Sequence, residues 1–260
     1  MTNSSDTGRP LVLVTGASSG IGQALAEVIA ADAYDLVLVA RRKDRLDALA
    51  ARLPCRTTVA AVDIAAPGGV DDLMARLDGR PVHILINNAG FGAGGPFAKT
   101  ERERQLAMVD LNIRAVVDLT HRVLPGMLAE RSGGILNVAS TAAYQPGPRM
   151  SVYYASKAFV LSFSEALWEE CRHHGVTVTA LCPGPTTTEF GEISGMSDLR
   201  VFRYATKMTA DDVAREGWAA FNAGKRVKIT GMQNKLTRAG ALLAPHRLLL
   251  PIVRRLQSPG

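Results

Sequence analysis

Residues 11–22 read LVLVTGASSGIG, an unbroken apolar run followed by three glycines in the spacing GxxxGxG. The apolar run predicts a buried β-strand over residues 11–15, and the stretch after it is typical of a helix. Gly16 would permit a tight turn, Gly20 would let backbone amides approach a phosphate, and Gly22 would let the helix pack closely on the strand. The start of a helix also offers free N–H groups and a positive dipole end. The stretch therefore predicts a loop that binds a dinucleotide pyrophosphate; the alternative is a glycine-rich turn without a ligand.

Short apolar runs alternate with helical stretches along the rest of the chain. Further strands are predicted at residues 36–40, 58–62, 82–86, 134–139, 176–182 and 226–230, and helices at 20–31, 43–53, 69–77, 152–173 and 210–223, with a long amphipathic stretch at 100–131. Strands that are apolar throughout indicate burial on both faces, as in a parallel sheet. We therefore expect one α/β domain over residues 10–233, a Rossmann fold with a doubly wound parallel sheet of seven strands.

Composition restricts the class of protein. The chain has 260 residues, of which 47% are hydrophobic and 21% charged, as in an ordinary globular domain. Its net charge of +6 comes without a recognition-helix pattern or a basic strand interleaved with aromatic residues. We therefore expect this charge to attract an anionic cofactor or only to keep the chain in solution, rather than to bind nucleic acid or an anionic membrane surface. The three cysteines lack CxxC spacing, and the polar residues 1–9 contain no apolar signal region. We expect a flexible N-terminus, no metal site and a cytoplasmic location.

The end of the second predicted strand indicates which dinucleotide the loop binds. NAD-binding folds place an acidic residue there for the ribose hydroxyls, whereas this chain reads Val39-Ala40-Arg41-Arg42. Planar guanidinium groups suit a phosphate, so we expect NADP(H) rather than NAD(H), with Arg41 as the preferred contact to the 2′-phosphate. The alternative is that both arginines only solvate the start of the next helix.

Tyr153 and Lys157 lie four residues apart in a predicted helix and therefore on one of its faces. A free phenol has a pKa of about 10, but a nearby ammonium favours the phenolate and would bring the pKa of Tyr153 into a useful range. Ser140 follows a predicted strand at the carboxyl edge of the sheet, where open α/β sheets bind ligands. Taken alone, the Tyr–Lys pair favours an ordinary helix that happens to carry both residues; with Ser140 placed beside it, proton transfer to a substrate is favoured.

Several motifs occur in an order that resembles the short-chain dehydrogenase/reductase family over nearly the whole chain: residues 15–22, Asn87-Asn88-Ala89-Gly90, Asn112, Ser140, Tyr153, Lys157 and Pro183-Gly184. The resemblance implies an oxidoreductase that transfers a hydride between NADP(H) and a carbonyl or alcohol substrate. It implies Tyr153 as the acid or base, Lys157 on the nicotinamide ribose, Ser140 on the substrate oxygen, and Asn112 in a water-linked proton relay. With the two arginines, the expected cofactor contacts are Gly16, Ser18, Ser19, Gly20, Ile21, Gly22, Arg41, Arg42, Asp63, Ile64, Asn88, Ala89, Gly90, Tyr153, Lys157, Pro183, Gly184, Thr186 and Thr188.

Two segments lie outside these motifs. Residues 185–208 are rich in Gly, Thr, Ser and Pro and are expected to form a lid. The lid and neighbouring loops contribute apolar side chains that favour a fairly large apolar substrate (ketone, aldehyde, acyl or steroid-like): Phe91, Phe97, Tyr144, Met150, Phe190, Met196, Phe202 and Tyr204. Residues 234–260 form a basic amphipathic extension that we expect to pack on the domain or on a partner subunit; the alternative is peripheral membrane contact through residues 235–256.

Other functions are compatible with parts of this pattern. One alternative is an NADPH-binding regulatory protein without turnover, and another is a membrane-associated scaffold. The complete proton-transfer set argues against the first, because a pure binder needs no matched tyrosine and lysine. Liposome sedimentation of a chain truncated before Lys235 would test the second. We expect an enzyme that forms a homodimer or homotetramer.

Overall fold

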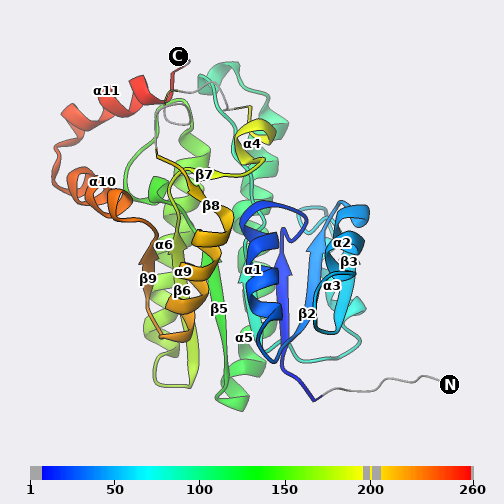
Figure 1. Cartoon of the computed structure of the whole chain (residues 1–260). Coiled ribbons are helices and arrows are strands. Elements are labelled where there is room, and N and C mark those ends of the chain that lie inside the picture. Colours follow the sequence, from blue (N-terminus) through cyan, green and yellow to red (C-terminus); the bar gives the residue numbers. More distant parts are fainter. Residues whose placement is uncertain (1–7, 196–199, 201–205, 259–260) are drawn as a thin grey trace.

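The computed structural model describes residues 8–195, 200 and 206–258, and a parallel sheet of seven strands forms its centre (Figure 1). The strands are β1 (Leu11–Thr15), β2 (Asp35–Ala40), β3 (Thr57–Ala61), β4 (Ile84–Asn87), β5 (Gly133–Val138), β6 (Val176–Cys182) and β9 (Val227–Ile229). Their order is β3-β2-β1-β4-β5-β6-β9, so the chain changes direction across the sheet between β1 and β4. Ligands of doubly wound sheets bind at this switch point. The expected fold class is confirmed.

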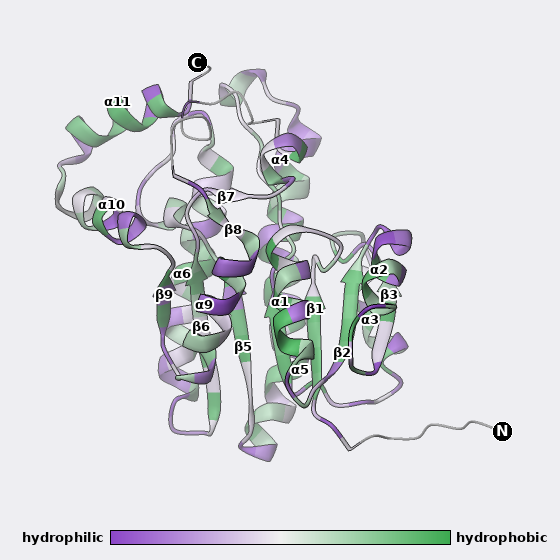
Figure 2. Cartoon of the chain, viewed as in Figure 1, coloured by the Kyte–Doolittle hydropathy of each residue, from purple (hydrophilic) through white to green (hydrophobic). Residues whose placement is uncertain are grey.

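Helices cover both faces of the sheet. One face packs against α1 (Gly20–Ala30), α2 (Lys43–Ala50) and α9 (Ala210–Asn222), and the other against α3 (Gly69–Arg76), α5 (Ala115–Glu130) and α6 (Ser151–Cys171). Within β1, Val12 packs in the apolar core on the side of α1, and Leu13 packs in the core on the side of α3; both side chains are fully buried. Each such burial stabilises the fold by about 1.5–3 kcal/mol, which explains the uninterrupted apolar pattern of the strands (Figure 2).

The long helical stretch expected at residues 100–131 is interrupted. It consists of α4 (Arg102–Val109), a π-helical turn η2 (Asp110–Arg114) and α5. A π-helical turn therefore interrupts the amphipathic stretch that contains Asn112. A π-turn inserts one extra residue, and here it carries Asn112, which is 1% exposed, into the interior.

Short elements lie beyond the carboxyl edge of the sheet. Strand β7 (Thr186–Thr187) pairs in parallel with β8 (Met208–Thr209), and α7 (Phe190–Ile193) follows β7. Helices α10 (Met232–Leu243) and α11 (His246–Leu256) lie at the same end of the molecule, as do the 3₁₀ turns η1 (Phe97–Lys99) and η3 (Thr141–Tyr144) (Figure 1). Within the described ranges, none of the helices combines the length and apolarity needed to cross a bilayer.

Candidate active site

The turn after β1 is shaped by contacts with the segment after β4. Gly16 has a φ of +68°, and a Cβ there would lie 2.6 Å from Asn88 Nδ2, so glycine is required. A Cβ on Gly22 would lie 2.3 Å from the Gly16 carbonyl oxygen, which explains the third glycine. Asn88 Nδ2 donates to the Thr15 carbonyl oxygen (2.9 Å) and fixes the turn. Ser19 precedes α1 without a side-chain capping hydrogen bond, so the first N–H groups of this helix suit an anion.

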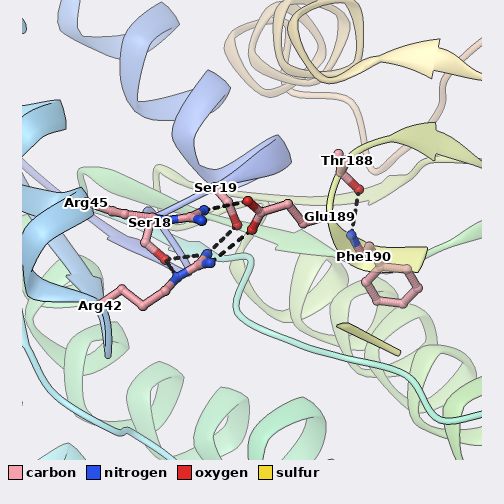
Figure 3. Close-up of polar contacts among 7 residues, drawn as sticks. All are labelled: Ser18, Ser19, Arg42, Arg45, Thr188, Glu189 and Phe190. Atoms are coloured by element: carbon pink, nitrogen blue, oxygen red, sulfur yellow. Dashed lines mark hydrogen bonds and ion pairs between the residues drawn. The ribbon is translucent and has the colours of Figure 1, made fainter. Parts of the chain in front are cut away.

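The two arginines after β2 have different surroundings. Arg42 donates from Nε and Nη2 to the Ser18 hydroxyl (3.2 and 3.1 Å), and from Nη2 to the Ser19 hydroxyl (2.8 Å) (Figure 3). Both serines belong to residues 15–22, the segment expected to bind a pyrophosphate, which we call the phosphate loop. The Arg41 side chain is 75% exposed, and its Nη1 lies 3.8 Å from the Asp63 carboxylate. The preference for Arg41 as the phosphate contact stays a prediction, and Arg42 is the arginine that the fold holds against the loop.

Ser140, Tyr153 and Lys157 meet at the carboxyl edge of β5. Ser140 is the second residue after this strand, and its hydroxyl donates to the Pro183 carbonyl oxygen over a long 3.4 Å. Helix α6 carries Tyr153 and Lys157, and the Lys157 Nζ lies 6.0 Å from the centre of the Tyr153 ring. Lys157 Nζ also donates to the Val138 carbonyl oxygen (2.7 Å), which orients the ammonium. The four-residue spacing thus places both groups on one helix face, as expected.

Burial dominates the electrostatics of this cluster. Burial raises the pKa of the Tyr153 phenol, and a hydrogen bond with Ser140 acts in the opposite direction. Burial also lowers the pKa of Lys157 to about 8, so the ammonium is still the main form at neutral pH. The direction for Tyr153 is opposite to the expected one, because the loss of water outweighs an ammonium that lies 6.0 Å from its ring.

Asn112 connects the loop after β4 to helix α6. Its Nδ2 donates to the Phe91 carbonyl oxygen (3.0 Å) and to Ser156 Oγ (3.0 Å), and its Oδ1 accepts from the Phe91 N–H (3.2 Å). Ser156 Oγ in turn donates to the Tyr153 carbonyl oxygen (2.7 Å). Through Ser156, the Asn112 amide therefore holds the backbone of α6 between Tyr153 and Lys157.

A cavity of about 920 Å³ joins the phosphate loop to the cluster of Ser140, Tyr153 and Lys157. Among the expected catalytic and cofactor-binding residues, Gly22 and Asn112 lie behind its wall and the others line it. Among the residues expected to contact substrate, Phe91, Met150 and Phe190 line it.

Two other residues expected in the substrate pocket, Phe97 and Tyr144, do not line the cavity. Phe97 is 65% exposed, and the Tyr144 hydroxyl donates to Cys182 Sγ (3.7 Å). Met196, Phe202 and Tyr204 lie outside the described residues. Within the part of the chain that the structure describes, three or more His, Cys, Asp or Glu side chains nowhere gather as they would around a metal ion.

Part of the cavity wall comes from residues that the sequence did not lead us to expect there. Helices α10 and α11 contribute Asn234, Arg238, Ala241, Val253 and Leu256, followed by Gln257. Gln257 is 2% exposed, and its Nε2 donates to the Tyr154 hydroxyl (2.5 Å). Glu189, which also lines the cavity, was not expected either. The amphipathic pattern of residues 235–256 indicates that one face is buried but not against what, and a single glutamate carries no sequence signal.

Known proteins share both the sequence pattern and this fold. The family profile described as short chain dehydrogenase matches residues 10–195. Serine 3-dehydrogenase of Agrobacterium fabrum is 34% identical over 230 residues, which cover 85% of this chain and 92% of that protein. The NADP-dependent 3-hydroxy acid dehydrogenase of Salmonella typhi is 31% identical over 246 residues, 91% of this chain and 99% of that protein. A short-chain dehydrogenase from Sphingobium yanoikuyae, solved in complex with NADPH, is 34% identical with a TM-score of 0.80, covering 88% of this chain and 93% of the other. The chain therefore belongs to the short-chain dehydrogenase/reductase family of oxidoreductases.

Proposed function

We propose that the chain is an NADP(H)-dependent enzyme that interconverts a carbonyl and an alcohol. The observation that carries this proposal is that the phosphate loop and the Ser140–Tyr153–Lys157 cluster line the same cavity. A binding protein without turnover needs no phenol and lysine buried together at the end of its cofactor cavity. This arrangement favours an enzyme over a regulatory NADPH-binding protein.

The cavity fits a dinucleotide phosphate. The turn at Gly16 and the uncapped start of α1 would hold the pyrophosphate, and Arg42, with Arg41 beside it, would hold the 2′-phosphate. Asp63, which also lines the cavity, would lie near the adenine, and Lys157 would hold the nicotinamide ribose. When bound, NADP(H) supplies or accepts the hydride. The absence of an acid at the end of β2, where the chain reads Val39-Ala40-Arg41-Arg42, favours this cofactor over NAD(H).

Proton transfer falls to Tyr153. Its raised pKa keeps the phenol protonated at neutral pH, the form that donates a proton to a carbonyl oxygen during reduction. Ser140 would donate to the same oxygen, since its bond to Pro183 is long and easily exchanged. The Lys157 ammonium would stabilise the phenolate that forms, and the Asn112 turn would support a water-linked relay that returns the proton.

The substrate end of the cavity favours an apolar carbonyl compound. Its walls include Phe91, Met150, Phe190, Val253 and Leu256. The Phe190 ring lies 5.5 Å from the Tyr153 ring, so an apolar side chain stands beside the proton donor. Ketones or aldehydes with bulky aliphatic or aromatic groups would bury more surface here than a sugar would.

The direct test is a screen of NADPH consumption over aliphatic, aromatic, steroid and acyl carbonyls. We expect turnover with at least one apolar class, and a strong loss of kcat in Ser140→Ala with little change in NADPH affinity. Tight NADPH binding without turnover of any class would support the regulatory alternative instead.

Two large apolar side chains on α5 and α6 support a homo-oligomer. Val117 and Phe159 are each 37% exposed, and the Phe159 ring stacks on Phe163 at 5.7 Å. Exposed apolar side chains that form a contiguous patch often mark subunit contacts. We propose a dimer or tetramer that buries them, and light scattering of Phe159→Glu should show smaller particles than the unsubstituted chain.

The outer face of α11 supports peripheral contact with an anionic membrane surface. Leu248 and Ile252 are 65% and 58% exposed. Residues 231–260 contain five Lys or Arg and no Asp or Glu. Basic groups beside exposed apolar ones are what such a surface attracts. We propose that the chain sediments with vesicles containing phosphatidylserine but not with neutral vesicles, and that Ile252→Glu abolishes this sedimentation. Equal sedimentation of the unsubstituted chain and Ile252→Glu would contradict the membrane contact.

A further inference from the structure

Glu189 connects the lid to Arg42, the arginine that is hydrogen-bonded to the phosphate loop. Its carboxylate oxygens accept from Arg42 Nη1 (2.9 Å) and Arg45 Nη1 (2.6 Å). Figure 3 shows the carboxylate facing both guanidinium groups, with Ser18 and Ser19 also bonded to Arg42. Glu189, which lies 147 positions from Arg42 in the sequence, thus binds the guanidinium group that is proposed to contact the 2′-phosphate.

The residues around Glu189 reach the catalytic end of the cavity. We define the lid segment as residues 186–195, which follow Pro185. Within it, Ser194 Oγ accepts from the Gly92 N–H (3.0 Å), on the loop after β4. The Phe190 ring lies 5.5 Å from the ring of Tyr153. The lid segment therefore touches both the proton donor and, through Glu189, the phosphate loop.

The Glu189 carboxylate occupies donors that a phosphate would use. The side chains of Glu189 and Arg42 are both 36% exposed, so their ion pair is weak and readily exchanged. A phosphate carries more charge and three acceptor oxygens, so it binds guanidinium groups more strongly than a carboxylate does. Arg42 would stay oriented after the exchange, because Ser18 and Ser19 hold its Nε and Nη2. Two anions on the same arginines would also repel each other.

We propose that Glu189 competes with the 2′-phosphate of NADP(H) for Arg42 and Arg45. This inference rests on the proposed cofactor. Binding of the phosphate displaces the carboxylate and releases the lid segment from the phosphate loop. A cofactor without the 2′-phosphate leaves Glu189 in place, so this residue links the identity of the cofactor to the position of the lid beside Tyr153.

The test uses two fragments that lack the nicotinamide: adenosine 2′,5′-bisphosphate and adenosine 5′-monophosphate. Their binding to the full chain, to Glu189→Gln and to Glu192→Gln is measured by calorimetry. Glutamine keeps the size of the side chain and removes its charge. We expect Glu189→Gln to bind the bisphosphate about fivefold more tightly, in line with the loss of two weak ion pairs, and the monophosphate unchanged. Glu192, on the same short helix, takes no part in these ion pairs and is the matched control.

Hydrogen exchange in the peptide covering residues 188–195 gives a second readout. The bisphosphate should raise exchange in the unsubstituted chain, and Glu189→Gln should show raised exchange without it. Unchanged or weaker binding of the bisphosphate by Glu189→Gln would overturn the competition, and unchanged exchange would overturn the release of the lid; both leave the proposed function intact. If the unsubstituted chain prefers neither fragment, the assignment of NADP(H) itself fails.

Discussion

Replacing Arg42 by alanine should separate the two nicotinamide cofactors. Arg42 is the cation held on the phosphate loop by Ser18 and Ser19, and its side chain is 36% exposed. Hydrogen bonds to charged groups contribute about 1.5–3 kcal/mol, and partial exposure favours the lower end. We therefore expect Arg42→Ala to weaken NADPH binding by about 1.5–2 kcal/mol, or roughly 12- to 30-fold. NADH has no 2′-phosphate, so its affinity should change by less than about twofold.

Fluorescence titration of both cofactors measures this difference. Lys43→Ala is the matched control, because Lys43 is the next cation along the chain and pairs instead with Asp47 (2.7 Å) on the exposed side of α2. It should leave both affinities nearly unchanged. Equal losses for NADPH and NADH in Arg42→Ala would refute the 2′-phosphate assignment. No loss for either would mean that Arg42 serves only the contacts seen with Ser18 and Glu189.

Three further predictions concern Arg41, Asn112 and Lys157. Arg41→Asp should weaken NADPH binding far more than NADH binding, since it puts a second carboxylate beside Asp63; equal losses in the same titration would contradict this. Asn112→Ala should lower the free energy of unfolding by about 2–4 kcal/mol, because it leaves the buried N–H and carbonyl partners of the amide unsatisfied; an unchanged urea midpoint would count against the role of the π-turn. Lys157 has its pKa lowered from 10.5 to about 8, so the folded chain binds fewer protons than the unfolded chain between these values. Below pH 8 the buried ammonium lowers the free energy of unfolding by its full amount. As the pH increases from 8 to 10, the free energy of unfolding should rise by about 1–3 kcal/mol, and Lys157→Met should lack this slope.

The sheet and the phosphate loop follow directly from local sequence. A run such as residues 11–15 is apolar at every position because both faces of β1 are covered, and no helix of the same length would bury every side chain. Gly16 and Gly22 are likewise predictable, since their steric demands arise within the turn itself. Ser140, Tyr153 and Lys157 could be predicted because their positions depend on one strand end and one helix face.

Other features depend on contacts that no local pattern encodes. The π-turn at Asn112 breaks the 3.6-residue period by one residue, which apolar spacing alone does not reveal. The choice between Arg41 and Arg42 depends on which side of the chain faces the loop, and Glu189 depends on a lid contact that is distant in sequence. The pKa of Tyr153 was expected to fall because the sequence showed a neighbouring ammonium but not the depth of burial.

The central claim is that Tyr153 supplies the proton for carbonyl reduction. The measurement is single-turnover oxidation of bound NADPH by Tyr153→Phe, with the best carbonyl compound from the screen, together with the NADPH affinity of the same variant. Tyr34→Phe is the control, because Tyr34 packs edge-on against Trp218, away from the cavity. We predict a rate lower by a factor of about 10²–10⁴ in Tyr153→Phe, with NADPH affinity within about twofold. A rate close to that of the unsubstituted chain would contradict the claim and assign the proton to another group in the cavity.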